Sequence, residues 1–501
     1  MSADLITGIL EALSLWPLAA ALGGLVMGVI VGAIPGLTAS ITVAILLPFT
    51  FFMPPTVGIG FLLGIYKGAV YGGSIPAILL NTPGTPAAAA TSLDGYALTR
   101  KGQARRALQL SLYASVFGDL FATMVLIGVA APLAAVALKF SAPEYAVLFL
   151  ASLVLIATVS GKDLTKGILS AGAGALIGCI GLDAMTSTQR FIFDVPELLG
   201  GVPLVPLIIG MFALSEVLIQ VARPPALDLS AAGVQTTGPS LSRSDFMKQI
   251  KNLFRSTSIG TFIGALPGLG AEIACWVAYG ISRQRSKTPD EFGSGSLEGV
   301  AAAESGANAT VPATLIPMLI FGIPGDVVTA VLIGAFIAQG ITPGPLLFSA
   351  HGSVIYALFA LLVLTNVALI FVGKVAIRSF SLVIRIPNAL LMSCILVVSL
   401  AAAYSINSDP YDVVVMVMGG IAGILMRGAS IPIPPFIIAV LLAPQLELTV
   451  RQSLALSDGD PSIFLTRPIS GSLLVLFVAF FAYIIWKFLS APKASRVVSN
   501  D

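Results

Sequence analysis

The stretch from Tyr71 to Pro86 most limits what this chain can fold into. It reads Tyr-Gly-Gly-Ser-Ile-Pro-Ala-Ile-Leu-Leu-Asn-Thr-Pro-Gly-Thr-Pro, and it lies in an apolar part of the sequence. Proline removes a backbone donor and clashes with the preceding helical turn, and glycine adopts conformations that other residues resist. Non-helical backbone survives at membrane depth only where protein buries it or where it lines a watery cavity. We therefore expect broken backbone here that holds a polar ligand.

The composition indicates a membrane protein. Of the 501 residues, 57% are hydrophobic and 10% are charged, whereas soluble chains have roughly 25% charged residues. The apolar runs predict an all-α polytopic integral membrane protein with about a dozen membrane elements, since one span needs about 20 residues. A net charge of +2 is too small to indicate a nucleic-acid partner, and the three cysteines and one histidine show no metal-ligand spacing.

The same landmarks occur twice in the same order. Gly-Ala-Ile-Pro-Gly-Leu at 32–37 recurs as Gly-Ala-Leu-Pro-Gly-Leu at 264–269, and each copy precedes a second Pro-Gly break, at 83–84 and at 324–325. Paired, proline-interrupted segments at corresponding positions are typical of the binding site of a secondary transporter. The predicted division is a first membrane repeat, 1–225, a cytoplasmic linker, 226–256, and a second membrane repeat, 257–501.

Basic residues predict that the two repeats have opposite orientations. Cytoplasmic loops are enriched in Lys and Arg. In the first half, 50–56 has no basic residue and 100–106 has four; in the second half, 283–287 has three and 341–352 has no Lys or Arg. Equivalent loops therefore face opposite sides, which predicts two inverted-topology repeats with discontinuous helices and re-entrant hairpins. This orientation places the linker and the C-terminal tail in the cytoplasm.

The breaks also predict the chemistry of the ligand. A helix that ends inside the membrane exposes unpaired N–H groups and a partial positive charge, which suit a carboxylate. Freed carbonyls and hydroxyls suit Na⁺, so we expect an anionic substrate and a coupling cation near the Pro-Gly breaks, and no other cofactor. The candidate substrate-binding residues are Pro35, Gly36, Thr38, Lys67, Tyr71, Gly73, Ser74, Asn81, Thr82, Pro83, Gly84, Thr85, Pro267, Gly268, Asn308, Thr310, Pro324, Gly325 and Asp326. The candidates for handling the coupling ion are Ser40, Glu272, Glu304 and Asp326.

Several alternatives stay open at this point. The breaks also fit simple kinks that let helices pack, and the titratable side chains leave a proton open in place of Na⁺. Lys67 and Asp326 flank the two hairpins, so they would form either a structural or a substrate-facing pair if the halves close on each other. The sequence has no phosphate-binding Gly-x-x-x-x-Gly-Lys-Ser/Thr pattern and no nucleophile–base pair. We therefore expect no enzyme activity, and the alternative to a symporter is a passive channel or scaffold subunit.

The sequence resembles the large membrane subunit of the tripartite tricarboxylate transporters over nearly its whole length. The motifs that carry the resemblance are Gly-Ile-Tyr-Lys-Gly-Ala-Val-Tyr-Gly-Gly-Ser at 64–74, Asn-Thr-Pro-Gly at 81–84, Glu-Gly-Val-Ala-Ala at 298–302, Gly-Ile-Pro-Gly at 322–325, Gly-Ile-Thr-Pro-Gly-Pro at 340–345 and Phe-Leu-Thr-Arg-Pro at 464–468. The resemblance implies a cation-driven importer of di- or tricarboxylates in the bacterial inner membrane. It also implies two partners, a small membrane subunit and a periplasmic solute-binding protein. An elevator-type movement is expected by analogy with other carboxylate transporters that use paired hairpins.

The sequence departs from the pattern of these transporters at two positions. Ala307 replaces one of two paired asparagines, and Asp326 stands where a small hydroxyl side chain is usual. An added carboxylate repels a trianion. We therefore expect either a smaller or less charged carboxylate than citrate, or a protonated Asp326.

Overall fold

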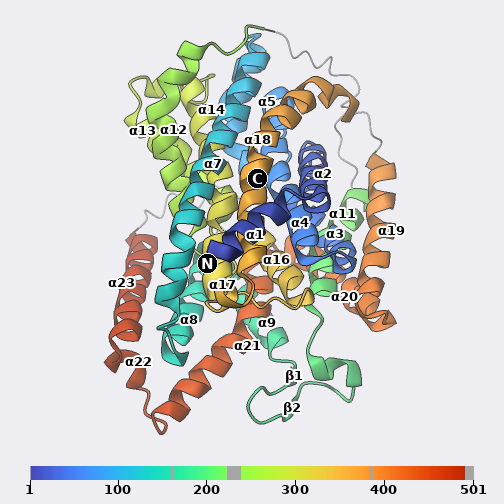
Figure 1. The fold of residues 1–501 in the computed structure, drawn as a ribbon, viewed down its shortest axis with the longest axis vertical. Helices are drawn as coiled ribbons and strands as arrows, with labels where there is room; N and C mark the ends of the chain where they lie inside the picture. The colour runs from blue at the N-terminus through green and yellow to red at the C-terminus, as the bar shows by residue number, and fades with distance from the viewer. Residues whose placement is uncertain (1, 160–162, 223–237, 384–387, 491–501) are drawn as a thin grey trace.

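A computed structural model describes residues 2–159, 163–222, 238–383 and 388–490 (Figure 1). In this part of the chain the secondary structure is helical except for one antiparallel pair of strands, β1 (Gly181–Leu182) and β2 (Gln189–Arg190). The helices before residue 223 are α1 (Ser2–Ala12), α2 (Leu15–Gly32), α3 (Ala39–Leu46), η1 (Leu47–Phe52), α4 (Pro55–Gly72), α5 (Ser74–Leu80), η2 (Pro86–Ala88), α6 (Ala89–Arg100), α7 (Ala104–Ala137), α8 (Ala142–Val159), α9 (Leu164–Gly178), η3 (Pro196–Gly200), α10 (Leu204–Ile208), η4 (Ile209–Leu214) and α11 (Ser215–Ala222). The helices after residue 237 are α12 (Arg243–Gly264), α13 (Gly270–Arg285), η5 (Pro289–Glu291), α14 (Leu297–Ala313), α15 (Leu315–Phe321), α16 (Val327–Ala338), α17 (Leu347–Ala350), α18 (Gly352–Val383), α19 (Asn388–Asn407), α20 (Pro410–Gly428), α21 (Ile433–Leu456), α22 (Ile463–Thr466) and α23 (Pro468–Ser490).

Eight helical segments of the described chain are long and apolar enough to cross a membrane. They are Leu15–Gly32, Pro55–Leu80, Ala104–Ala137, Leu204–Ala222, Gly352–Phe380, Ala389–Asn407, Pro410–Gly428 and Ile433–Leu456. Shorter apolar helices accompany them, at Ala39–Phe52, Ala142–Thr158, Leu164–Gly178, Val327–Ala338 and Pro468–Ala482. These segments confirm the prediction of an all-α, multi-pass membrane protein.

Helices α2 and α4 pack closely against each other, and glycine makes their approach possible. Every fourth residue along the contact is glycine, at Gly24, Gly28 and Gly32 on α2 and at Gly64, Gly68 and Gly72 on α4. A methyl group at any of these positions would meet a backbone carbonyl oxygen of the other helix. Small residues four apart allow membrane helices to pack backbone against backbone, which van der Waals contact stabilises.

The predicted breaks interrupt the helices at corresponding places in the two halves. Helices α2 and α12 both end where the repeated Gly-Ala-x-Pro-Gly-Leu motif begins. Helices α5 and α15 each have seven residues. Both end on a residue in the left-handed conformation, Asn81 with φ 57° and Gly322 with φ 70°. The chain then returns through a Pro-Gly pair into α6 or α16.

Contacts between the two halves occur at both ends of the bundle. At one end, in the upper part of Figure 1, the loop after α6 and the first turn of α7 meet the second half: Lys101 Nζ donates to the Ser294 carbonyl at 2.6 Å, and Arg106 pairs with Asp245 at 2.7 Å. At the other end, Gln339 at the end of α16 donates to the Thr50 carbonyl of η1 at 2.5 Å.

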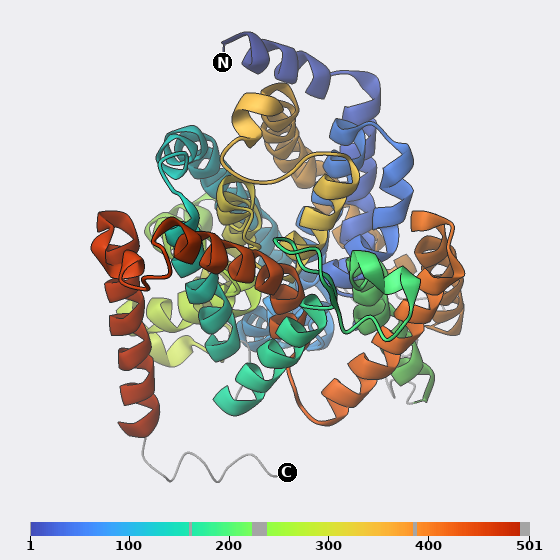
Figure 2. The ribbon, with the colours of Figure 1, turned by 90° about the horizontal axis from the view of Figure 1, so that it is seen from below.

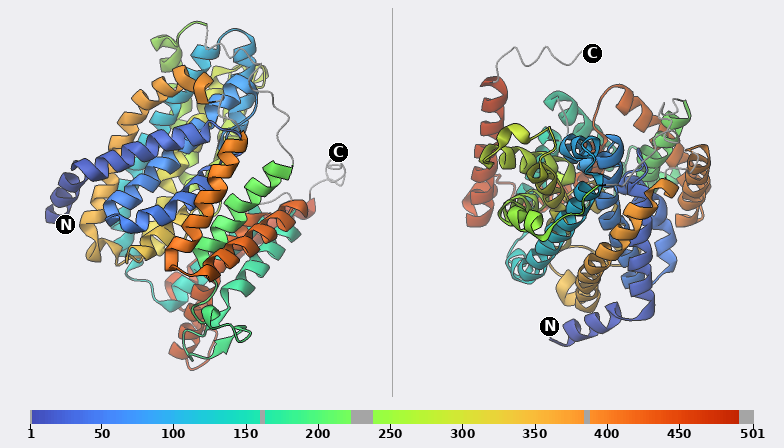
Figure 3. Two further views of the ribbon diagram at one scale, coloured as in Figure 1. Left: turned by 90° about the vertical axis from the view of Figure 1, so that its right-hand side faces the viewer. Right: turned by 90° about the horizontal axis from the view of Figure 1, so that it is seen from above.

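The outer helices surround this core on several sides. Helices α23 and α19 lie on opposite flanks of the body (Figures 1 and 2). The β1–β2 hairpin projects from one end (Figures 1 and 3). Two ion pairs to α21 hold it there: Arg451 of α21 binds Asp183 at 2.7 Å, and Glu447 of α21 binds Arg190 at 2.8 Å.

The predicted linker falls partly outside the described residues, because 223–237 are not described, and neither is the tail 491–501. Helix α12 begins at Arg243, where Ser242 and Asp245 form a reciprocal capping box. This helix continues without interruption to Gly264. The secondary structure therefore has no boundary between residues 256 and 257, and the division of the chain into 1–225, 226–256 and 257–501 stays a prediction.

Candidate functional site

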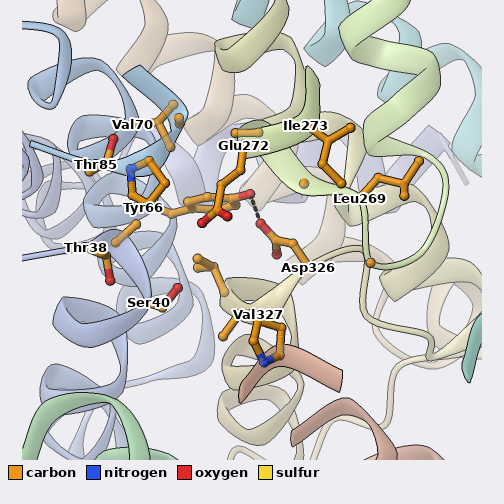
Figure 4. Close-up of a pocket in the computed structure, with 18 of the residues that line it drawn as sticks. Thr38, Ser40, Tyr66, Val70, Thr85, Leu269, Glu272, Ile273, Asp326 and Val327 are labelled. Atoms are coloured by element: carbon orange, nitrogen blue, oxygen red, sulfur yellow. Dashed lines mark hydrogen bonds between the residues drawn. The ribbon is translucent and has the colours of Figure 1, made fainter. Parts of the chain in front are cut away.

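A cavity of about 160 Å³ lies among four of the helix starts (Figure 4). The first half contributes Thr38, Ala39 and Ser40 at the start of α3 and Thr85, Pro86 and Ala87 before α6. The second half contributes Gly268, Leu269, Gly270, Ala271, Glu272 and Ile273 around the start of α13 and Asp326, Val327 and Val328 at the start of α16. Tyr66 and Val70 of α4 and Pro434 and Ile438 of α21 complete the lining.

Local sequence fixes where these helices begin. The Thr38 hydroxyl accepts from the Ile41 N–H at 3.4 Å, which caps α3. Asp326 caps α16, because its Oδ1 accepts from the Thr329 N–H at 2.8 Å. The first N–H groups of a helix have no partner within the helix and carry its positive dipole end. Four such ends directed toward one cavity favour an anion.

The cavity is built from equivalent positions of the repeated motifs, but the two halves supply different chemistry. Counted from the repeated glycines, Ser40 corresponds to Glu272, and counted from the repeated prolines, Thr85 corresponds to Asp326. The first half therefore lines the cavity with hydroxyl groups, whereas the second half lines it with two carboxyl groups. Figure 4 shows the side chains of Glu272 and Asp326 converging beside Tyr66.

Tyr66 of α4 links the first half of the chain to the second half at the cavity wall. Its hydroxyl donates to Asp326 Oδ2 at 2.5 Å and lies 3.3 Å from the Thr314 hydroxyl, at the junction of α14 and α15. Two carboxyl groups in one small cavity repel each other when both are ionised. A proton, a cation or a ligand with hydrogen-bond donors would relieve that repulsion.

The structure brings only some of the predicted site residues to the cavity. Thr38, Ser40, Thr85, Gly268, Glu272 and Asp326 line it. The other predicted residues lie outside its lining: Pro35, Gly36, Lys67, Tyr71, Gly73, Ser74, Asn81, Thr82, Pro83, Gly84, Pro267, Glu304, Asn308, Thr310, Pro324 and Gly325. Among these, Asn81 is exposed at the end of α5. The assignment of Glu304 to the coupling ion and of the others to the substrate remains a prediction.

The Pro-Gly residues act as a close-packed frame behind the cavity. The Gly84 N–H donates to the Gly73 carbonyl at 3.1 Å, and the Gly268 N–H donates to the Gly325 carbonyl at 2.6 Å. A methyl group on Gly84 would meet the Gly32 carbonyl oxygen, so this position requires glycine for a close backbone approach. The breaks thus hold the helix starts in place.

Lys67 pairs with Asp119 rather than with Asp326. The Lys67 ammonium lies 3.0 Å from Asp119 Oδ1, and both side chains are fully buried. Lys67 also donates to the Leu362 carbonyl at 2.6 Å. This pair therefore joins α4 to α7 and α18, and Asp326 has the Tyr66 hydroxyl as its partner instead.

Sequence reasoning missed Tyr66, the cavity residue whose hydroxyl joins the first half of the chain to the second. The available signal was its place beside Lys67 in the 64–74 motif. Nothing in that motif says which face of α4 points toward the cavity. Tyr66 and Val70, four residues apart on one helical face, are the two residues of α4 that line it.

Interrupted apolar helices, with a cavity lined from both halves of the chain, define a multi-pass helical membrane protein. Residues 18–438 match the model of the Tripartite tricarboxylate transporter TctA family, and the chain belongs to this family. It is therefore a membrane component of a tripartite tricarboxylate transporter, which confirms the resemblance and the expectation that the chain is not an enzyme.

Two proteins of Agrobacterium vitis are similar to this chain. One, described as "Uncharacterized 52.8 kDa protein in TAR-I ttuC' 3'region", is 35% identical over 456 residues, which is 91% of this chain and 90% of that protein. The other, described as "Uncharacterized protein in TAR-II ttuC' 3'region", is 36% identical over 217 residues, which is 43% of this chain and 90% of that protein. No solved structure matches the chain.

Proposed function

We propose that this chain is the translocating subunit of a secondary active symporter that imports an organic carboxylate of the di- or tricarboxylate class together with Na⁺ or H⁺. The observation that carries the proposal is the convergence of four helix amino-termini on one cavity lined from both halves of the chain. Such ends bind anions through free N–H groups and the helix dipole. Family membership supports the class of substrate.

The carboxylate is bound at the hydroxyl-lined side of the cavity, by Thr38, Ser40 and Thr85 and the N–H groups of α3 and α6. Glu272 and Asp326, on the opposite side, handle the coupling cation or proton. The remaining predicted residues of the breaks act from behind the cavity, by holding these helix starts in register. The asymmetry between hydroxyl and carboxyl sides supports this division of labour.

Contacts at the two ends of the bundle support an inverted repeat. The loop after α6 touches the segment between α13 and α14, and the segment between α3 and α4 touches the end of α16. By the repeated motifs, the segment between α3 and α4 corresponds to the segment between α13 and α14. Each contact therefore joins non-equivalent loops, as it must if the halves have opposite orientations. An elevator-type movement of the two hairpins together, α4–α6 and α14–α16, then gives the cavity access to either side of the membrane.

The transporter works with two partners, a small membrane subunit (TctB-like) and a periplasmic solute-binding protein (TctC-like) that delivers the substrate. The family description names a tripartite system, which supports this assembly. We place the chain in the bacterial inner membrane, with the linker 226–256 and the C-terminal tail in the cytoplasm. The basic residues near Lys101 and Arg106 lie at the same end as the start of α12, which supports this orientation.

Counterflow in liposomes that contain the full chain and both partners tests the proposal. We expect saturable exchange of labelled succinate or citrate, and uptake that depends on an imposed Na⁺ or proton gradient. Ser40→Ala should weaken uptake, whereas Ser393→Ala, an exposed serine that bonds only within α19, should not. Flux that neither saturates nor responds to either gradient would instead identify a passive channel or scaffold.

A further inference from the structure

Outside the cavity, Glu304 lies in a second polar group that the substrate site does not use. Glu304 is in α14, and its side chain is 1% exposed. Its Oε1 accepts from the Thr91 hydroxyl at 2.5 Å and its Oε2 from the Ser115 hydroxyl at 2.9 Å. Both partners are neutral. In the described part of the chain no Lys, Arg or His lies within 4.0 Å of this carboxylate. Lys67 forms its ion pair with Asp119.

The group sits deep inside the helix bundle. Ser115 is the twelfth residue of α7, a 34-residue span that begins at Ala104, so it lies roughly 17 Å along that helix at 1.5 Å per residue. An ionised carboxylate at such depth is costly unless a partner neutralises it. The protein supplies hydroxyl and amide groups but no counter-charge.

Oxygen atoms surround this carboxylate on several helices. Asn308 donates to the Ser115 hydroxyl at 2.9 Å, and the Ser74 and Ser111 hydroxyls lie 2.8 Å apart one turn away. We call Glu304, Thr91, Ser115, Asn308, Ser74, Ser111 and Tyr71 the Glu304 cage. They come from α4, α5, α6, α7 and α14. Each of these side chains is at most 1% exposed.

Two oxygen atoms of the cage have no partner. Asn308 Oδ1 and the Tyr71 hydroxyl are fully buried and make no hydrogen bond to any of the residues that the structure describes. The Asn308 Nδ2 group donates to the Ser115 hydroxyl and to the Glu304 backbone carbonyl, which holds the amide beside the cage, and the Tyr71 side chain lies near Glu304. Buried polar atoms without partners are rare, and an unfilled ion site is one explanation for them.

We propose that the Glu304 cage binds a Na⁺ ion. Hard cations take oxygen ligands such as carboxylates, hydroxyls and carbonyls. One carboxylate neutralises one positive charge, so a divalent ion would leave a net charge in the apolar interior. A proton binds one oxygen atom, whereas Na⁺ is coordinated by several. Na⁺ therefore accounts for the two oxygen atoms without partners.

The cage connects directly to the substrate cavity. Helix α6 places Thr91 in the cage, and the turn that leads into α6 (Pro86 and Ala87) lines the cavity. Cys275, next to the cage in α13, contacts the Glu272 carbonyl at 3.0 Å, and Glu272 lines the cavity. An ion that pulls Thr91 toward Glu304 therefore fixes the α6 start that faces the substrate. The role of this ion in coupling rests on the proposed transport function, but its binding does not.

Thermal unfolding of the purified full chain tests the binding without transport. In NaCl, compared with choline chloride, the Tm of the wild type should rise and saturate. Glu304→Gln should abolish the rise, and Glu298→Gln, the same change in the first turn of α14 and outside the cage, should preserve it. Ser115→Ala keeps the charge and should raise the half-saturating Na⁺ concentration about tenfold or more, the effect of losing one ligand to a charged group.

Three results would overturn the site. A Na⁺-dependent rise that persists in Glu304→Gln would place the ion elsewhere. If Glu304→Gln does not fold, an unchanged half-saturating Na⁺ concentration in Ser115→Ala would also place the ion elsewhere. A Tm that responds to pH but not to Na⁺ would identify a proton site. If Na⁺ raises the Tm but the counterflow responds to no ion gradient, the Na⁺ site stands and only the proposed symport fails.

Discussion

Asp326 should limit how much negative charge a substrate can carry, and removing its charge gives a quantitative test. Asp326→Asn keeps the shape of the side chain, and asparagine caps a helix as well as aspartate does, so the start of α16 should survive. With the amide oxygen at the cap, the amide NH₂ group faces the Tyr66 hydroxyl at the position of the 2.5 Å bond and can donate to its oxygen. The variant therefore changes the charge of the cavity more than its structure.

The size of the effect follows from the cavity. Its volume is about 160 Å³, so a bound carboxylate lies within roughly 5 Å of Asp326, where an effective dielectric constant near 20 gives about 3 kcal/mol per unit charge. That energy corresponds to about a hundredfold in affinity for each substrate charge that faces Asp326. A trianion should therefore gain more than a dianion.

Competition counterflow measures both affinities. Unlabelled citrate and succinate should compete against labelled succinate at a pH where both are fully ionised, and Asp326→Asn should lower the half-saturating concentration of citrate by a larger factor than that of succinate. Asp409→Asn is the matched control, because Asp409 caps α20 through the Tyr411 N–H at 2.8 Å and lies outside the cavity. Equal factors for the two substrates, or unchanged half-saturation with a lower rate, would refute the repulsion argument.

Three further changes test the frame of the site. Lys67→Met leaves Asp119 buried and unpaired, so it should lower stability by about 3–5 kcal/mol, and adding Asp119→Leu should recover most of that loss in thermal unfolding. Gly84→Ala should prevent correct packing, because the methyl group meets a backbone carbonyl; a normal yield of folded protein in the membrane would contradict this. Tyr66→Phe should lower stability by about 1.5–3 kcal/mol through loss of its bond to a carboxylate, whereas Tyr145→Phe, which removes a hydroxyl without a partner, should have little effect.

The class of fold could be read from the sequence because its causes are local. Length and apolarity decide whether a segment can span a membrane, and proline and glycine decide where a helix must stop. The breaks near Pro35, Pro83, Pro267 and Pro324 interrupt helices as predicted. Their repetition also located the part of the chain that forms the cavity, since residues beside all four breaks line it.

The particular residues of the site depended on packing that local sequence does not encode. Asn81 and Thr82 have the polar side chains expected of a binding tip, yet they lie outside the cavity lining, whereas Tyr66 faces it. The sequence allowed Lys67 to approach Asp326 if the two halves closed on each other, but α7 brings Asp119 to Lys67 instead.

Sequence alone determined that the chain is a multi-pass helical membrane protein with repeated breaks, and its motifs determined the family. Tertiary structure alone decided which side chains share a space. Thr91, Ser115 and Glu304 are separated by up to 213 positions along the chain and still form one cage. The physical reason is that helix formation and termination depend on neighbouring residues. The face that each helix turns inward depends on how closely its partners approach, as the glycines between α2 and α4 illustrate.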